Sequence, residues 1–329
     1  MEMTPVAAGA FPMGRPYEFD GLGQERETPV HEVYLDAYEI STYPITNRQF
    51  ADVLNWALNQ GYLADPEGKV YTGGPVYAYS AALADIAPGG VIFEDGRFMT
   101  RHAQGHDGAA VCLADHPVVR VSWHGAVVFC NWLSQMHGLP PAYDTAAWER
   151  HEPVTTGYRL PTEAEWERTA AWDGQKHWRY GVTSDNLDYT RANFKLSDDP
   201  PEQSNPLCLT WFLQTSPVGW YNGLNPARLA EPDILTKDGA SPVGCYDMAG
   251  SVLEWCHDWF DADYYAHSPG SNPAGPREGL ARSVRGGTKV YPAEHCRAAY
   301  RVGFEPVYRS FALGFRIART PDPVNHSQK

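Results

Sequence analysis

The second half of the chain is the feature that most constrains the fold. From Gly174 onward, about 150 residues are dominated by turn residues and show little helical or strand periodicity. A polar segment of this kind would be disordered, but this one carries Trp178, Trp211, Trp220, Trp255 and Trp259. The segment is therefore predicted to be packed but irregular. Within it, residues 283–285 and 314–317 are predicted to be short strands between loops.

Helix signals lie in the first half. Thr46 and Gln49 have the spacing of a capping box, and apolar residues at helical spacing follow them. A Thr side chain at this position accepts a hydrogen bond from the backbone three residues on, while the Gln side chain reaches back. These residues predict a helix from about Asn47 to Leu58.

Two further helices are predicted from their end signals. The second begins at Ser122 and ends before Gly138, which two prolines follow. The third begins after Thr162, which forms another capping box with Glu165, and Gly174 is its predicted C-cap. Before these helices, the apolar alternation over Val33–Ile40 predicts one half-buried strand.

Composition excludes several classes of protein. A hydrophobic share of 43% excludes a fully disordered chain, and a net charge of −14 makes nucleic acid a poor partner. The N-terminus lacks a basic stretch followed by an apolar one, and no run approaches the roughly 20 apolar residues of a membrane span. We therefore expect a cytoplasmic protein without a membrane partner. The six cysteines show no CxxC spacing, which favours free thiols over a disulfide framework.

Basic residues concentrate modestly near the C-terminus. Their spacing between apolar residues predicts structural pairing of the guanidinium groups rather than a phosphate-binding tract. The residues concerned are Arg282, Arg285, Lys289, Arg297, Arg301, Arg309, Arg316 and Arg319.

Eight segments, read in order, carry a family resemblance. They are residues 9–14 (GAFPMG), 29–33 (PVHEV), 43–47 (YPITN), 116–123 (HPVVRVSW), 158–167 (YRLPTEAEWE), 246–255 (YDMAGSVLEW), 284–287 (VRGG) and 313–316 (LGFR). Together they resemble the formylglycine-generating, or sulfatase-modifying factor, family. The resemblance implies an α+β, C-type lectin-like fold of the formylglycine-generating-enzyme type, with a small twisted antiparallel sheet, two to three helices and long irregular loops.

The resemblance also sets the domain organisation. It implies one domain over residues 1–320, with inserts at about 66–115 and 201–240 and a frayed tail at 321–329. This replaces the two domains that the length alone would suggest. No internal repeat is visible in the sequence.

The resemblance brings a catalytic hypothesis that fails on the residues. The family's copper-dependent oxidase uses two cysteines, which carry over to Tyr291 and Cys296. One thiolate cannot supply the paired sulfur ligation that Cu(I) prefers. We therefore expect no catalytic residue, no catalytic cofactor and no enzyme activity, with Cys296 as a small core residue.

Other catalytic interpretations are weaker. Related sulfoxide synthases use a histidine triad from an additional domain, for which this chain has no room. His102 and His106 are spaced as a metal pair, but neighbouring glycines favour a solvated loop. Glu254 and Asp258 could form an acid/base pair, but a structural role in a tryptophan-rich core segment is preferred.

Calcium is the metal that the resemblance implies. Family members hold structural Ca²⁺ through amide, carbonyl and carboxylate oxygens, the ligands this ion prefers. Asn193 and the Phe194 carbonyl match one such site. Ser251 and Glu254 match a second, where Ser251 replaces the usual Asn.

The segment from Arg285 to Arg316 resembles the variable proteins of diversity-generating retroelements. A fixed framework of Arg, Gly and Pro surrounds positions that randomised Asn codons can reach, and Lys289, Glu294 and Glu305 fall outside that set. The loops at about 288–312 are predicted to be a binding face for an unknown protein or small-molecule ligand, with aromatic side chains giving large contact area. The predicted ligand-binding residues are Lys289, Val290, Tyr291, Pro292, His295, Val302, Gly303, Phe304, Val307, Tyr308, Ser310, Phe311 and Ala312.

Three hypotheses follow. The first is a non-catalytic variable binding protein. The alternative is a metal-dependent oxidase of the formylglycine-generating or sulfoxide-synthase type. The third is an accessory domain whose specificity is not diversified.

Overall fold

The largest sheet brings together strands from the irregular second half. The computed structural model describes residues 1–16, 23–63, 90–105, 109–196, 215–228 and 231–321. Within them, four strands lie in the order β15 (Val302–Phe304), β14 (Arg282–Arg285), β13 (Leu253–Trp259) and β16 (Leu313–Phe315). The β13–β14 and β14–β15 pairs are antiparallel, while β13 and β16 are parallel. Both short strands expected at 283–285 and 314–317 are therefore present.

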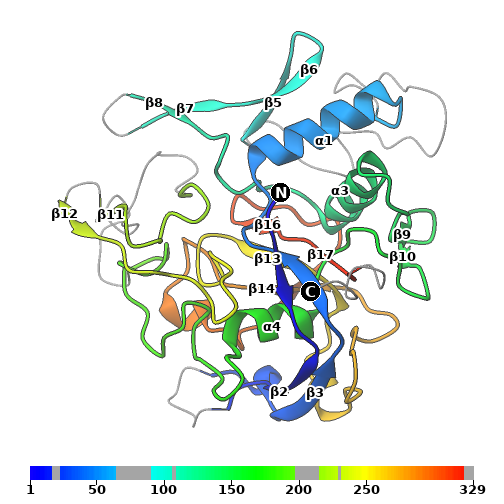
Figure 1. Ribbon diagram of the computed structural model, residues 1–329, viewed down its shortest axis with the longest axis vertical. Helices are drawn as coiled ribbons and strands as arrows, with labels where there is room; N and C mark the ends of the chain where they lie inside the picture. Colours follow the sequence, from blue (N-terminus) through cyan, green and yellow to red (C-terminus); the bar gives the residue numbers. More distant parts are fainter. Residues whose placement is uncertain (17–22, 64–89, 106–108, 197–214, 229–230, 322–329) are drawn as a thin grey trace, which may run out of the picture.

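A second sheet joins the two ends of the chain. Its order is β1 (Met3–Val6), β4 (Tyr38–Ser41) and β17 (Ala318–Arg319), and both pairs are antiparallel. The strands β2 (Gly9–Met13) and β3 (His31–Leu35) form a separate pair below it (Figure 1). The prediction of one strand over Val33–Ile40 is therefore wrong. The chain leaves one sheet after Leu35 and enters another at Tyr38. The alternation of buried residues therefore shifts by one position, from Val33 and Leu35 to Tyr38 and Ile40.

The three α-helices of the described residues follow their end signals closely. They are α1 (Asn47–Asn59), α3 (Trp123–Met136) and α4 (Glu163–Ala171). Both predicted capping boxes are present, and Ser122 caps α3 by accepting from the Gly125 amide. The prediction that Gly174 caps α4 is wrong, because Trp172 is the C-cap and Gly174 lies in the following turn with φ +97°.

Shorter elements cover the rest of the described chain. Two hairpins project above α1, β5–β6 (Val91–Glu94, Arg97–Thr100) and β7–β8 (His102–Gln104, Ala110–Cys112), while β11–β12 (Pro226–Arg228, Glu231–Leu235) projects at one side (Figure 1). A small pair, β9–β10 (Tyr143–Asp144, Glu149–Arg150), follows α3. The 3-10 turns are η1 (Glu25–Glu27), η2 (Tyr264–Ala266) and η3 (Ala293–Cys296).

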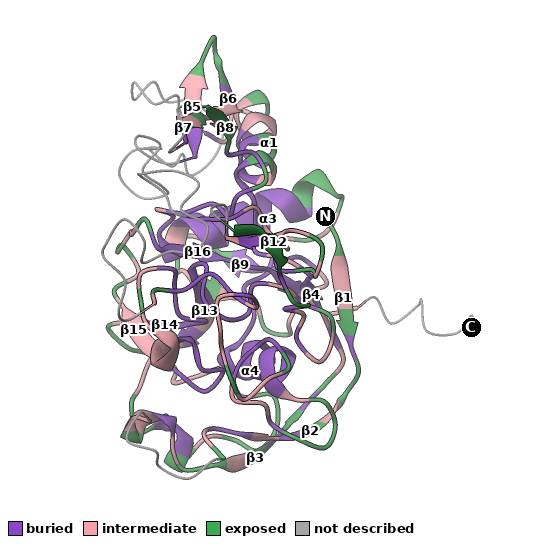
Figure 2. Ribbon diagram, turned by 90° about the vertical axis from the view of Figure 1, so that its left-hand side faces the viewer, coloured by how far each residue is buried: buried purple, intermediate pink, exposed green. Residues whose placement is uncertain are grey.

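The core lies between the helices and the central sheet. One apolar cluster packs α1 and α3 against β13, β14 and β16, and Figure 2 shows the buried residues gathered in this body of the molecule. On α3 every residue from Trp123 to Ser134 except His124 is buried, because the helix is covered on nearly all sides. A second cluster joins α4 to β2, β3 and β4. None of the described helices combines the length and apolar character that crossing a membrane needs.

The expected inserts and tail lie partly outside the described residues. Of the described residues, 91–104 and 110–112 of the first insert and 226–228 and 231–235 of the second belong to the projecting hairpins. Residues 64–89 and 197–214 and the predicted tail from 322 are not described. The single-domain organisation stays a prediction.

Candidate binding face

Buried ion pairs fix the C-terminal segment against α4. Arg301 Nε donates to Glu163 Oε1 at 2.7 Å, and Arg285 pairs with Glu167. All four side chains are buried. Burial alone would raise the pKa of Glu167, but the Arg285 charge and the His177 hydrogen bond lower it to about 2. These glutamates stand at i and i+4 on α4, so one helix face holds both arginines.

Two further pairs anchor the middle and the end of the segment. Arg297 Nη2 donates to Glu27 Oε1 at 2.8 Å, and Arg316 Nε donates to Glu254 Oε2 at 2.6 Å. The predicted structural pairing of the C-terminal arginines is confirmed for these residues. Removing one partner of such a buried pair leaves an uncompensated charge, which costs about 3–5 kcal/mol. The backbone of the segment is therefore held rigidly.

The residues between these anchors reach the surface. Four large apolar side chains of the binding face, defined here as the loops at about 288–312, are exposed. They are Tyr291 (36%), Val307 (57%), Tyr308 (43%) and Phe311 (37%). Val290, Pro292, His295, Val302, Gly303, Phe304 and Ser310 are of intermediate exposure. Eleven of the thirteen predicted ligand-binding residues thus lie at least partly at the surface.

The aromatic side chains of the face form two groups. The Phe304 and Tyr308 rings stack, with centroids 4.6 Å apart and planes at 24°. The rings of Tyr291 and His295 lie 5.3 Å apart at an angle of 45°. The Lys195 amide also donates to the Tyr291 carbonyl at 3.0 Å, which ties this end of the face to the neighbouring loop.

Two predicted contact residues are buried instead. Lys289 is 1% exposed, and its Nζ donates to the Phe311 carbonyl at 2.6 Å. Burial lowers the pKa of Lys289 to about 7, with Arg120 adding to the effect. Ala312 is 5% exposed and precedes β16. The prediction that these two side chains point outward is therefore wrong, because both pack against the central sheet instead of facing solvent.

Gly303 reaches the surface but leaves no room for a side chain. A Cβ built on it would lie 2.6 Å from Phe260 Cγ, closer than carbon atoms approach in folded proteins. Its backbone pairs with Ser283 of β14, so the strand cannot move away freely. Gly303 therefore contributes backbone, not a variable side chain, to the face.

Cys296 lies beneath the face as a core residue. It is fully buried in a small apolar cluster, and burial raises the pKa of its thiol to about 12. Tyr291, at the family's other cysteine position, is exposed. A buried thiol with a raised pKa is a weak nucleophile at neutral pH, which fits a core residue.

The residues that match the family's calcium sites lie together but are engaged. The Asn193 carbonyl accepts from the Ser251 amide at 2.7 Å. Both Glu254 oxygens bond to Arg316, and one also accepts from Trp166 Nε1 at 2.6 Å. The described residues contain no group of three His, Cys, Asp or Glu side chains that could hold a metal ion. Because Arg316 occupies the Glu254 carboxylate, that group does not fit a calcium site here. Calcium at Asn193 and Phe194 stays a prediction, and the ligands there would be uncharged amide and carbonyl oxygens.

The other candidate catalytic groups are structural or exposed. Asp258 is buried, and its Oδ2 accepts from the Glu163 amide at 2.9 Å. Burial and the neighbouring Glu163 charge raise the pKa of Asp258 to about 7. With Glu254 committed to Arg316, the two do not form an acid/base pair. His102 is exposed on β7, while His106 lies outside the described residues.

The cysteines of the described residues are all free thiols. Cys112 is exposed, and Cys130, Cys245, Cys256 and Cys296 are buried. Burial raises the pKa of each of these four thiols. Cys208 lies outside the described residues.

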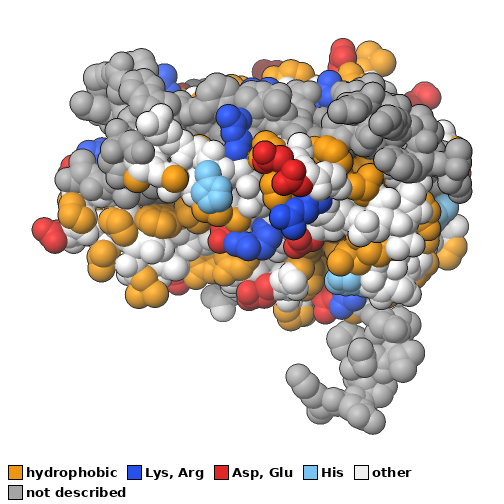
Figure 3. Space-filling view, turned by 90° about the horizontal axis from the view of Figure 1, so that it is seen from above, with side chains coloured by type: hydrophobic (Ala, Val, Ile, Leu, Met, Phe, Trp, Pro, Cys, Tyr) orange, Lys and Arg blue, Asp and Glu red, His pale blue; other side chains and the backbone are white. Residues whose placement is uncertain are grey.

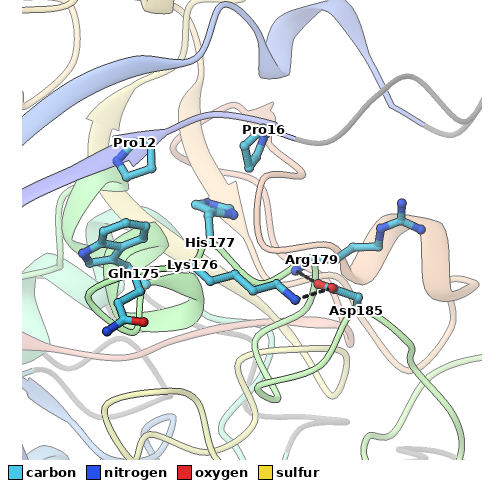
Figure 4. A pocket seen from close by; sticks show the side chains of 8 residues that line it. Pro12, Pro16, Gln175, Lys176, His177, Arg179 and Asp185 are labelled. Atoms are coloured by element: carbon cyan, nitrogen blue, oxygen red, sulfur yellow. Dashed lines mark hydrogen bonds and ion pairs between the residues drawn. The ribbon is translucent and has the colours of Figure 1, made fainter.

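A pocket lies between residues 12–16, at the end of β2, and residues 172–185, which follow α4 (Figure 4). It has a volume of about 410 Å³, and Pro12, Pro16, Trp172, Gln175, Lys176, His177, Arg179 and Asp185 line it. Lys176 Nζ bonds to Asp185 Oδ2 at 2.6 Å. None of the thirteen predicted ligand-binding residues lines this pocket. The surface seen from above, a different side of the molecule, has basic and acidic side chains next to each other near its centre (Figure 3).

The α+β architecture and the anchored irregular loops define a C-type lectin-like fold of the formylglycine-generating-enzyme type. The chain belongs to the family described as "Sulfatase-modifying factor enzyme 1-like domain", which matches residues 1–321. Both the predicted family and the predicted fold class are confirmed.

Sequence relatives have two kinds of name. The chain is 28% identical over 320 residues to the serine/threonine-protein kinase pkn1 of Chlamydia caviae, covering 97% of this chain but 38% of that protein. It thus spans well under half the length of the chlamydial kinases that it matches. It is also 28% identical over 343 residues to the formylglycine-generating enzyme of Thermomonospora curvata, covering 97% of this chain and 93% of the enzyme.

Solved structures share the fold over nearly the whole chain. Treponema denticola variable protein 1 superposes with a TM-score of 0.58 at 23% identity, covering 97% of this chain and 95% of that one. CarF superposes with a TM-score of 0.59 at 23% identity, covering 98% of each chain.

Proposed function

We propose that the chain is a non-catalytic ligand-binding protein whose loops at about 288–312 form a sequence-diversified binding face. The observation that carries this is the outward placement of Tyr291, Val307, Tyr308 and Phe311 on a frame of buried ion pairs. A rigid frame lowers the entropy lost on binding, because the backbone is already ordered. Aromatic side chains then supply contact area with few rotatable bonds.

Two comparisons bear on the proposal. A protein named variable protein 1 has this fold, so the fold is one that a variable protein uses. At the position of the family's first cysteine this chain has the exposed Tyr291, and Cys296 is buried with a pKa near 12. Of the two cysteines that the oxidation would use, the first is therefore replaced by an exposed tyrosine and the second is a buried thiol.

The proposal is tested by separating binding from stability. Replacing Tyr291, Phe304, Tyr308 and Phe311 together with Ala should lower the melting temperature only slightly, because three of these side chains are exposed and Phe304 is half-buried. A matched control is Phe315→Ala at a fully buried ring, where about 3–5 kcal/mol of stability is expected to be lost. If the quadruple variant is destabilised as strongly as the control, the four rings are core residues and the face does not exist.

Diversification has its own test in the coding DNA. A reverse transcriptase gene should lie nearby, together with a near-copy of the codons for 285–316 that differs only at adenines. Absence of both would leave an undiversified binding protein.

The second candidate is a metal-dependent oxidase, which the relatives named formylglycine-generating enzyme favour. It requires tightly bound copper or iron and consumption of oxygen with a thiol-bearing substrate. Metal analysis and an oxygen electrode measure both, and stoichiometric metal together with oxygen uptake would replace the binding proposal by this one.

A further inference from the structure

One turn of the binding face combines aromatic and acidic groups. The Glu305 carbonyl accepts from the Tyr308 amide at 2.8 Å, and Pro306 occupies the second position of the turn, as its fixed φ favours. The Pro306 carbonyl accepts from the Trp123 amide at 3.0 Å, which fixes the turn to the start of α3. We call residues 304–308 the aromatic turn. Its backbone is held at both β15 and α3.

The aromatic turn offers the face of a ring to a ligand. Phe304 is half-buried and stacks on one face of the Tyr308 ring, and Tyr308 is nevertheless 43% exposed, so we infer that the opposite ring face is the one a ligand can reach. Such a face attracts a cation within about 6 Å of its centre. The same interaction recurs inside this molecule, where the Arg282 guanidinium lies 3.7 Å from the Trp123 ring centre and 3.5 Å from that of Trp259.

A carboxylate stands at the start of the same turn. Glu305 is exposed, and within the described part of the chain its carboxylate has no hydrogen bond or ion pair. The first and fourth residues of such a turn lie within about 7 Å of each other, which places this charge beside Tyr308. The whole chain carries a net charge of −14, which attracts positively charged partners over a distance of about one Debye length.

Two lysines near the face lie away from the Glu305 carboxylate. Lys289 is buried, and Lys195 adjoins Tyr291 at the other end of the face. Arg309 follows Tyr308 directly and already interacts within the chain. Arg309 is the cation that adjoins Tyr308 in the sequence, so replacing it tests the sign of the interaction.

From this juxtaposition we propose that the partner presents a basic protein segment, with an arginine or lysine side chain over the Tyr308 ring and beside the Glu305 carboxylate. The inference rests on the proposed binding function and names the chemical class of its ligand. It predicts an interaction that weakens as salt is added, because both the ion pair and the attraction to the acidic chain are screened.

The test measures binding of a defined probe by fluorescence anisotropy. The probe is a fluorescein-labelled peptide of alternating arginine and glycine, and its counterpart carries citrulline in place of each arginine, which keeps the shape and removes the charge. The arginine peptide should bind, and the citrulline peptide should bind about fivefold or more weakly. Glu305→Gln and Tyr308→Ala should each weaken arginine-peptide binding about twofold to fivefold.

Two variants control for net charge. Glu32→Gln removes the same charge from an exposed position on β3, far from β15 (Figure 2), and should change the affinity less than Glu305→Gln does. Arg309→Gln should strengthen binding. Equal effects of Glu305→Gln and Glu32→Gln, or weaker binding by Arg309→Gln, would overturn the inference.

A selection from a random peptide library separates this inference from the function on which it rests. Peptides whose binding is lost in the quadruple alanine variant should be rich in arginine and lysine. Face-dependent peptides that lack basic residues would refute the basic ligand and leave the binding face standing. If no enriched peptide depends on the four aromatic side chains, the binding face itself is refuted.

Discussion

Gly303 provides the sharpest test of how the frame limits variation. It belongs to the predicted contact set, yet a Cβ there would lie 2.6–2.7 Å from three Phe260 carbons. Glycine in a strand normally costs about 0.5–1 kcal/mol relative to alanine, so Gly303→Ala would be stabilising if space allowed it. Forcing a methyl group into a packed site costs about 1–3 kcal/mol. The clash is the larger effect, and the expected net loss is about 0.5–2 kcal/mol.

The measurement is equilibrium unfolding in urea, followed by tryptophan fluorescence. Gly270→Ala is the matched control, because its Cβ would meet only a carbonyl oxygen at 4.0 Å and its φ is not in the left-handed region. The control should stay within about 0.5 kcal/mol of the original protein. Phe260→Leu should reduce the cost of Gly303→Ala, since it removes the ring that the methyl group meets. An alanine at 303 that is neutral or stabilising would refute the packing argument.

Three further predictions concern charges and thiols. Burial raises the pKa of Asp247 to about 6, so ionising this carboxyl lowers the free energy of unfolding as the pH rises from about 4 towards 7. Asp247→Asn should therefore be about 1–3 kcal/mol more stable than the original protein at pH 8 and should lose this advantage below pH 4. A gain that is independent of pH in urea titrations would contradict this. Arg301→Met should cost up to about 3–5 kcal/mol because the buried Glu163 loses its closest ion pair and keeps only Arg285 at 3.7 Å, and the double variant with Glu163→Gln should recover part of that loss in the same assay. Among the described thiols of the folded protein, iodoacetamide should label Cys112 first, as peptide mass spectrometry can check, and labelling of Cys296 at an equal rate would show that its thiol is neither buried nor protonated.

Most of the regular local structure could be predicted from short-range sequence signals. A capping box joins residues only three apart, so Thr46 with Gln49 and Thr162 with Glu165 locate α1 and α4 without any tertiary information. The arginine spacing likewise indicated buried pairing. The sequence analysis did not identify the glutamates that form ion pairs with those arginines. The spacing of Glu163 and Glu167, four residues apart on a predicted helix, could have indicated them.

The sequence by itself therefore determined the family, the fold class, the helix starts and the loops that carry the proposed contacts. Only the tertiary structure decided which side chains of those loops face outward. Lys289 and Ala312 turn inward and Gly303 meets Phe260, because β16 and β15 join strands distant in the sequence. The split between β3 and β4 has the same cause, since each strand takes its register from a different partner. Contacts between distant residues set burial, and no local pattern encodes them.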